Sequence, residues 1–403
     1  MPPPRPSNTH KDVLTNCRRS RLLLFRSWSP NLCIFMCIMS LAAVAKPTRV
    51  SLDAVNSEFR QLAETVALSG EDNAQVATVV ENNSEVKPEA EMGQVAGTPL
   101  TVRVLTFNIW LSGRRVENGL EKIAKHIRQI NPDIVSLQEV ETPDVMNNIT
   151  EMLGHPWNAV WHGNRSYPDT AILTKHKFML DQIVEVNWGN GAPVLVVKHG
   201  RSFVVNFFAM HLNYTSYGPY AAQNRMVTRK EQIYKGESSI EGRVDNIQEL
   251  LDHPNFQAFA KEAEDSGRPL IVAGDFNCPS HQDWTEETKH LHGGWVFEWP
   301  ATKMLTDIGM VDSYRELHPN VIEAPGHTWS TVQKSSGPEW EWSIPEPQDR
   351  LDFIFYKGSR WLKPIKSYTY AGTEPLTPIP NQWDNDYPSD HYAVLTDFKV
   401  IAE

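Results

Sequence analysis

Polar side chains that could do chemistry follow apolar stretches at four places in this sequence. Asn108 follows Thr101–Phe107, Glu139 follows Asp133–Gln138, His211 follows Phe203–Met210, and a fourth stretch, Leu270–Gly274, leads into Asp275 and Asn277. An amide can offer oxygen to a cation, a carboxylate that ends an apolar strand needs a partner, and an imidazole can bind phosphate or move a proton. Each of these places also has a purely structural interpretation. Asn108 could form a turn, Glu139 could begin a surface loop, His211 could be a buried core histidine, and Asp275 with Asn277 could form an Asx-turn.

Two further stretches near the C-terminus add acids and a second histidine. Asp390 and His391 directly precede the apolar run Tyr392–Phe398, and Asp352 lies inside the apolar run Leu351–Tyr356. A buried aspartate needs a partner, and a catalytic imidazole needs an acceptor that fixes its tautomer. We therefore expect Asp352 to orient His391. The alternative for Ser389-Asp390 is that these two residues cap the end of a helix or a strand.

Elements that could position these side chains can be read from hydrophobic periodicity. Apolar or alternating runs predict strands, and apolar residues at helical spacing predict helices over 118–130, 221–234 and 244–263. The predicted strands start at Thr101, Asp133, Ala171, Val194, Phe203, Leu270, Leu351 and Tyr392. Strands alternate with helices early and dominate later, which indicates an α/β fold of two sheets covered by helices, in one domain over 101–403.

Six short strings in this order resemble the endonuclease/exonuclease/phosphatase superfamily: T-F-N, L-Q-E, H-L-N, G-D-F-N, R-L-D-F-I and S-D-H. Gly326-His327-Thr328-Trp329 also resembles the G-x-T-W segment of that family. The resemblance covers 101–403 and implies a four-layer sandwich, with two mostly antiparallel sheets face to face and helices outside.

The resemblance also implies the role of each matched residue. Asn108 and Glu139 would hold a divalent metal with Asp390 nearby. Asp275 and Asn277 would position the attacking water and the transition-state oxygens, and His211 would face the phosphate. His391, oriented by Asp352, would act as base or phosphate stabiliser, and Asp275 and His391 remain alternatives for the general base.

The cofactor implied by the resemblance is Mg²⁺, or Mn²⁺, and the reaction is hydrolysis of a phosphodiester or phosphomonoester. A hard cation held by carboxylate and amide oxygens offsets charge on the phosphate and lowers the pKa of bound water. Cys278 is the only cysteine after residue 45, which excludes a cysteine-based zinc site in the mature chain. The expected partner is therefore a phosphate ester: a small molecule, a lipid headgroup or a nucleic acid. Nothing in the sequence indicates a protein partner, and we expect a monomer.

Charge narrows the choice of substrate. The formal net charge is -11, and without residues 1–45 it is -16, from 32 basic and 48 acidic residues. Polyphosphate backbones are repelled by such a chain, so small phosphodiesters or phospholipid headgroups are favoured over duplex DNA. One alternative is a secreted nuclease with a local basic patch around Arg225, Arg229 and Lys230. Another is a non-enzymatic binding module on the same scaffold.

The N-terminal segment has the pattern of a targeting signal. Arginines precede the uncharged run Leu32–Ala45, which ends in the small-x-small pattern Ala43-Val44-Ala45. This predicts that residues 1–45 form a signal peptide, with an uncleaved signal anchor as the alternative. Residues 46–100 are polar and acidic, which indicates a flexible linker or propeptide. We therefore expect a secreted or lumenal glycoprotein, with sequons at Asn82, Asn148, Asn164 and Asn213.

Overall fold

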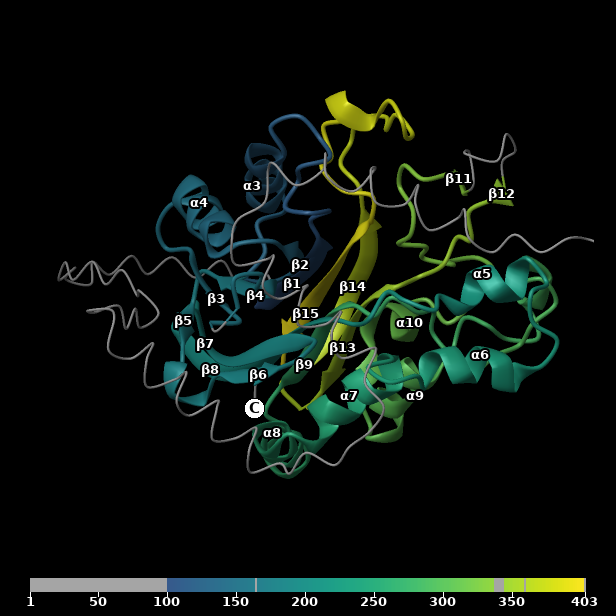
Figure 1. Cartoon of the computed structure of the whole chain (residues 1–403). Coiled ribbons are helices and arrows are strands. Elements are labelled where there is room, and N and C mark those ends of the chain that lie inside the picture. The colour runs from purple at the N-terminus through teal and green to yellow at the C-terminus, as the bar shows by residue number, and fades with distance from the viewer. Residues whose placement is uncertain (1–99, 164, 337–343, 359, 402–403) are drawn as a thin grey trace, which may run out of the picture. The chain divides into compact units, whose positions relative to one another are not determined.

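The computed structural model describes residues 100–163, 165–336, 344–358 and 360–401 (Figure 1). The expected signal segment, nearly all of the expected linker and its sequon at Asn82 lie outside these residues, as does Asn164. None of the described helices combines the length and apolar character that a membrane span requires. The first described strand begins at Thr101.

Two sheets of mixed direction form the centre of the fold. The first has the order β14-β15-β1-β2-β4-β3 and the second β10-β13-β9-β8-β7-β5, with β6 paired to β7. Each contains one parallel pair, β1 with β2 and β8 with β9, and its other pairs are antiparallel. The strands of the first sheet are β1 Thr101–Asn108, β2 Ile134–Val140, β3 Asn158–Trp161, β4 Asp169–Thr174, β14 Leu362–Tyr370 and β15 Ala393–Val400. Those of the second are β5 Lys177–Phe178, β6 Val184–Val186, β7 Gly189–Lys198, β8 Arg201–His211, β9 Leu270–Asp275, β10 Val311–Asp312 and β13 Asp352–Lys357.

Helices cover the outer face of each sheet. The first sheet is covered by α3 Gly119–Ile130 and α4 Pro143–Leu153. On the other side of the molecule lie α7 Arg243–Asp252, α8 Pro254–Ser266 and α9 Pro300–Asp307 (Figure 1). The remaining elements are α5 Gly218–Gln223, α6 Lys230–Glu237, α10 Ser313–Leu317, the short pair β11 Ser335–Ser336 and β12 Ile344–Pro345, and the 3-10 turns Leu180–Gln182, Lys289–Leu291 and Gln382–Asp384.

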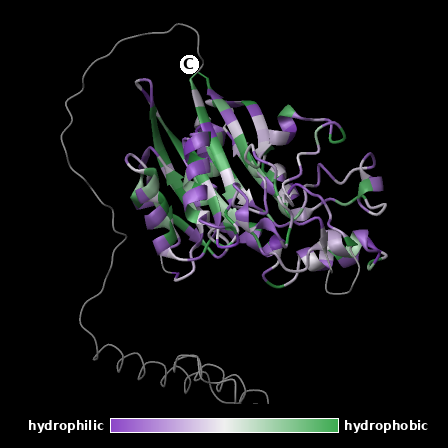
Figure 2. Cartoon of the chain, turned by 90° about the horizontal axis from the view of Figure 1, so that it is seen from above, coloured by the Kyte–Doolittle hydropathy of each residue, from purple (hydrophilic) through white to green (hydrophobic). Residues whose placement is uncertain are grey.

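Alternation of side chains along the strands explains the layers. On β9, Ile271 and Ala273 join the core between the two sheets, whereas Leu270 and Val272 join the core under α7 and α8. A third core lies between the first sheet and the helices α3 and α4. Figure 2 shows apolar residues along the strands and polar residues on the outer helices. The prediction of a four-layer α/β sandwich is confirmed.

The strand directions bring the predicted polar residues to one edge. The strands β1, β2, β8 and β9 end there, and β4, β13 and β15 begin there. The register shows this directly, because Asp275 pairs with both His211 and Asp352. Consequently residues far apart in the chain meet where the two sheets meet.

Two backbone features shape this edge. A bulge between Gln138 and Val140 gives Glu139 a positive φ of 64°, which redirects its side chain relative to the strand. Gly274 has a φ of 157°, and a Cβ at this position would lie 1.9 Å from the carbonyl oxygen of Met210. Only glycine therefore allows β9 to run this close to β8 directly before Asp275.

Two predicted helices are wrong in their extent. The helix predicted over 221–234 is two helices, α5 and α6, because Arg225 adopts a left-handed φ of 57° after α5 ends. The helix predicted over 244–263 is divided into α7 and α8, because Pro254 cannot continue a helix but begins one well. Strand β14 was not predicted, because it is an edge strand that contains Pro364 and a bulge.

Candidate active site

Asp275 is the centre of a buried polar cluster. The Asn108 side-chain nitrogen donates to Asp275 Oδ2 at 3.0 Å and to Glu139 Oε1 at 3.1 Å. The Asn108 amide oxygen accepts from the backbone N–H of Trp110 at 2.9 Å. One amide from the first sheet therefore joins a carboxylate at the end of β2 to a carboxylate at the end of β9 in the second sheet.

His391 lies near Asp275 and is oriented by Asp352. His391 Nδ1 lies 2.9 Å from Asp352 Oδ2, and His391 Nε2 lies 3.6 Å from Asp275 Oδ2. Burial raises the pKa of Asp352 to about 6. Burial alone lowers the pKa of His391, but the carboxylates of Asp352 and Asp275 outweigh it and raise that pKa well above its usual value. The expected contact between Asp352 and His391 is present.

His211 also lies near Asp275 and is paired with an aspartate of its own, Asp169. His211 Nδ1 lies 2.9 Å from Asp169 Oδ1, and His211 Nε2 lies 3.7 Å from Asp275 Oδ2. Burial lowers the pKa of His211, but the charge of Asp169 and its hydrogen bond outweigh burial and raise the pKa to about 10. The site thus holds two histidine–aspartate pairs that face one carboxylate.

Asp169 was not among the site residues predicted from the sequence. A usable signal was present, because an acid heads the apolar stretch Ala171–Thr174 just as Asp390 precedes the last strand. Asp169 lies on the first sheet and His211 on the second, so their contact depends on how the sheets face each other. Neither strand pattern alone could reveal that pairing.

Asn277 and Asp390 complete the predicted set. The backbone N–H of Asn277 donates to Asp275 Oδ1 at 2.8 Å, and its amide nitrogen donates to the Leu212 carbonyl at 2.9 Å. Asp390 is buried, and its Oδ1 finds no hydrogen-bond partner among the described residues. Burial raises the pKa of Asp390 to about 8. Within the described part of the chain, one oxygen of this buried carboxylate is therefore without the hydrogen-bond donor that would offset its desolvation.

The segment Gly326–Trp329 supports the His391 side of the site. Thr328 Oγ1 accepts the backbone N–H groups of Leu351 at 2.8 Å and Asp352 at 3.1 Å. The Trp329 ring lies 4.9 Å from the His391 ring, measured between centroids. The Trp329 indole N–H donates to Glu346 at 2.9 Å. Glu346, six residues before Asp352 in the chain, thus fixes this ring against the histidine.

The tyrosines after His211 differ in their surroundings. Tyr214 is exposed, whereas the hydroxyl of Tyr217 donates to Asp349 at 3.4 Å and that of Tyr220 donates to Glu346. Tyr217 and Tyr220 therefore pack against Asp349 and Glu346, which precede Asp352 closely in the chain.

All eight residues expected in the site lie at this edge of the two sheets, linked by contact or by adjacency in the chain: Asn108, Glu139, His211, Asp275, Asn277, Asp352, Asp390 and His391. Carboxylates that converge with amide and imidazole groups suit a divalent cation and a phosphate. This cluster at the edge of two packed sheets contains the groups that hydrolysis of a phosphate ester requires.

Residues 105–391 match the model of the Endonuclease/Exonuclease/phosphatase family. The chain belongs to this family, whose members are generally metal-dependent hydrolases of phosphate esters. The Caenorhabditis elegans protein F14F9.5, described as uncharacterized, is 49% identical over 300 residues, which span 74% of this chain and 92% of that protein.

Several solved structures are similar in fold. Truncated Caenorhabditis elegans TDP2 is 18% identical, with 74% of this chain and 98% of that chain covered and a TM-score of 0.44. An AP endonuclease from Archaeoglobus fulgidus is 15% identical, with 73% and 98% covered and a TM-score of 0.44. The human Nocturnin catalytic domain with bound sulfate is 18% identical, with 75% and 96% covered and a TM-score of 0.43.

Proposed function

We propose that this protein is a divalent-metal-dependent phosphoesterase that hydrolyses a phosphodiester or phosphomonoester by in-line attack of water. The observation that carries the proposal is the arrangement around Asp275. The imidazoles of two histidine–aspartate pairs approach this carboxylate, and the amide of Asn108 joins it to Glu139. Such a site has groups to orient water and groups to neutralise a phosphate.

The residues present fit a divalent cation. One oxygen each of Asp352 and Asp390 is buried without a hydrogen-bond partner among the described residues, and a cation would satisfy such an oxygen. By the family resemblance Asn108, Glu139 and Asp390 would hold Mg²⁺ or Mn²⁺. Ligand-type atoms of Asp275, Asp352 and His391 also lie within 4.8 Å of one another. When bound, the cation would offset phosphate charge and lower the pKa of water.

The other polar residues of the site would bind the water and the phosphate and orient the histidine rings. Asp275 and Asn277 lie where they can hold a water molecule and a phosphate oxygen, and His211 and His391 can donate to the other phosphate oxygens. The aspartate partners Asp169 and Asp352 fix the histidine rings, since each accepts from an Nδ1 atom. Either Asp275 or His391 acts as the base.

A panel assay tests this function. Purified protein is given nucleic acid, sphingomyelin-type lipids and phosphomonoesters, with Mg²⁺ or with a chelator, alongside Asp275→Asn. We expect turnover of at least one substrate that requires the metal and falls by about a thousandfold or more in the variant. Failure of every substrate to turn over, or equal turnover by the variant, would overturn the proposal.

Small phosphodiesters or lipid headgroups are the substrates favoured within this proposal, because the chain after residue 45 has a net charge of -16. The N-terminal pattern supports secretion or entry into the secretory lumen, with a signal anchor as the alternative. Mass spectrometry of the N-terminus of the protein recovered from culture medium tests this part. Recovery of the protein only in a membrane fraction, with Met1 or residue 2 as its first residue, would favour the anchor.

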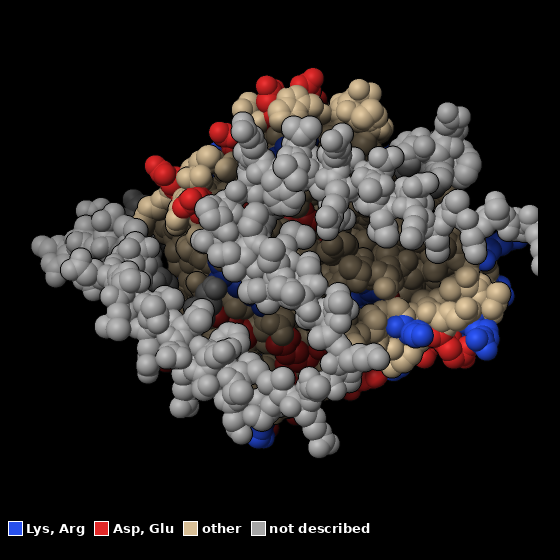
Figure 3. Space-filling model, viewed as in Figure 1, with Lys and Arg blue, Asp and Glu red and all other residues tan. Residues whose placement is uncertain are grey.

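A secreted nuclease is the second candidate, and one feature favours it. Arg225, Arg229 and Lys230 are all exposed. Figure 3 shows basic side chains at the end of the molecule that holds α5 and α6, with acidic side chains between them. DNA cleavage that weakens steeply as salt rises, and that falls further in Arg225→Glu with Arg229→Glu, would favour the nuclease over the small-ester enzyme.

A further inference from the structure

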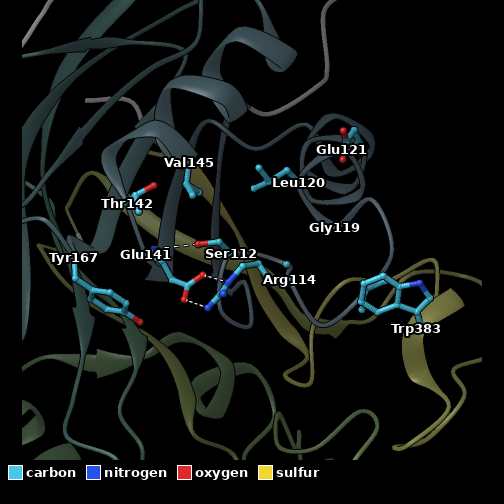
Figure 4. A pocket seen from close by; sticks show the side chains of 12 residues that line it. Ser112, Arg114, Gly119, Leu120, Glu121, Glu141, Thr142, Val145, Tyr167 and Trp383 are labelled. Carbon is cyan, nitrogen blue, oxygen red and sulfur yellow. Dashed lines mark hydrogen bonds and ion pairs between the residues drawn. The ribbon is translucent and has the colours of Figure 1, made fainter. Parts of the chain in front are cut away.

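A cavity of about 660 Å³ opens beside the catalytic cluster. Its walls include Ser112, Arg114, Leu120, Glu141, Tyr167 and Trp383 (Figure 4). We propose that this cavity binds the base of a small nucleotide ester whose phosphate lies at Asp275. The inference rests on the proposed function, which it deepens by naming the substrate class. The volume is in the range of small-molecule sites.

The cavity shares a wall with the predicted metal site. Ser112 donates its backbone N–H to the Glu139 carbonyl at 3.0 Å, and its Oγ accepts the backbone N–H of Glu141 at 3.0 Å. The Glu139 carboxylate accepts the N–H of Leu111 at 2.5 Å. One short loop therefore lines the cavity on one side and holds Glu139 on the other.

A second shared wall comes from Tyr167, which stands two residues before Asp169, the partner of His211. Tyr167 lines the cavity together with Glu141, which stands two residues after Glu139. An ester with its phosphate at Asp275 would consequently extend its organic part into this cavity.

The side chains that line the cavity favour a ligand group that is planar and has hydrogen-bonding atoms at its edge. Tyr167 and Trp383 are 43% and 53% exposed, so both rings are free to stack on a ligand. In Figure 4 the ion pair of Arg114 with Glu141 lies between the two rings and presents both donors and acceptors. A nucleobase offers an aromatic face to the rings and donors and acceptors at its edge.

Other occupants fit the same walls less well. An acyl chain would desolvate the Arg114–Glu141 pair without giving it a new partner. A quaternary ammonium group would suit the aromatic rings but would meet the Arg114 guanidinium. Further phosphates would meet Glu121 and Glu141, which line the cavity. The cavity therefore suits one nucleotide unit rather than a long nucleic acid.

Binding of adenosine 5′-monophosphate and of ribose 5-phosphate tests the inference, because the first carries adenine at C1′ where the second carries a hydroxyl group. Calorimetry in Mg²⁺ uses the full chain with Asp275→Asn, so that neither ligand is hydrolysed. We expect the monophosphate to bind about tenfold more tightly or better. Tyr167→Ala and Trp383→Ala, each added to this background, should each reduce that ratio several-fold. Tyr234→Ala removes a similarly exposed ring on α6 and should leave the ratio unchanged.

Equal affinities, or a preference that survives both ring variants, would overturn the inference. Tighter binding of phosphocholine than of the monophosphate, lost in Trp383→Ala, would overturn it in favour of a cationic headgroup. These outcomes are separable from the proposed function. Metal-dependent turnover of other esters without a base preference overturns only the inference. Preferential binding of the ligand with a nucleobase, without turnover of any ester by the wild-type chain, overturns only the proposed function.

Discussion

At the scale of single residues, the site depends on aspartates that act by orienting the histidines. His211 and His391 each have one ring nitrogen on an aspartate and the other toward Asp275. An imidazole held in this way has a fixed tautomer and a fixed direction, so the aspartates govern what the histidines can do. Asp169 and Asp352 are therefore positioning residues.

Asp169→Asn should lower kcat by about 10- to 100-fold with a smaller change in KM, because the amide no longer fixes His211 as a donor. The pH profile of kcat should also shift, since loss of the Asp169 charge lowers the pKa of His211. Steady-state kinetics from pH 5 to pH 10 measures both effects. Asp181→Asn, at an exposed position, is the matched control. An unchanged pH profile together with a lower kcat would mean that Asp169 is merely structural.

Mg²⁺ should raise the melting temperature of the protein, because a ligand that binds only the folded state adds about 2.7 kcal/mol of stability at a hundred times its Kd. Asp390→Asn should reduce this rise, since the variant loses a buried carboxylate near the cation. Thermal unfolding with increasing Mg²⁺ measures the effect. Asp384→Asn, at an exposed position on the preceding 3-10 turn, should keep the full rise. An undiminished rise in Asp390→Asn would remove Asp390 from the metal site.

At the scale of elements, the relation between the two sheets decides whether the site exists. Asn108 and His391 reach Asp275 across the sheets, and Asp169 reaches His211 in the same way. Far from the site, Asp133 makes a similar connection. It accepts from the backbone N–H of Arg103 at 2.8 Å on β1 and from Lys198 at 2.7 Å on β7.

Asp133→Asn should therefore lower the free energy of unfolding. Burial raises the pKa of Asp133, but hydrogen bonds from His176, Lys198 and Arg103 outweigh it and lower the pKa to about 2. A depressed pKa stabilises the folded state above pH 4, by about 2 kcal/mol at neutral pH, and this contribution disappears as the pH falls from about 4 to 2.

Urea unfolding at pH 7 and at pH 3 checks this prediction. The difference between wild type and Asp133→Asn should be about 2 kcal/mol at pH 7 and clearly smaller at pH 3. A difference that is the same at both pH values would show that the charge of Asp133 is not what connects β1 to β7.

At the scale of the whole molecule, N-glycosylation is compatible with activity only where the sugar leaves the candidate active site accessible. Asn148 lies exposed on α4, whereas Asn213 is 9% exposed, and its amide nitrogen donates to the Glu241 carbonyl at 2.8 Å. A sugar on Asn213 would break this hydrogen bond two residues after His211. We therefore expect active protein from a secretory host to be unmodified at Asn213.

Glycopeptide mass spectrometry of the active fraction checks this expectation. Asn148 provides an internal comparison, because the same digest reports its occupancy. Sugar on Asn213 in fully active protein would show that the turn after His211 does not need its native hydrogen bonds.

The sequence by itself determined the residue types of the site and the strand ends that present them. Alternation and apolar runs are local properties, so β1, β8 and β9 could be predicted together with Asn108, His211 and Asp275. Only the tertiary structure decided which groups meet. Asn108 and Asp275 are 167 residues apart, and their contact depends on packing between sheets that no local pattern encodes. For the same reason Asp169 and the cavity beside Glu139 could be identified only in the structure. Asp169 acts through His211 on the other sheet, and the cavity is lined by residues from separate segments of the chain.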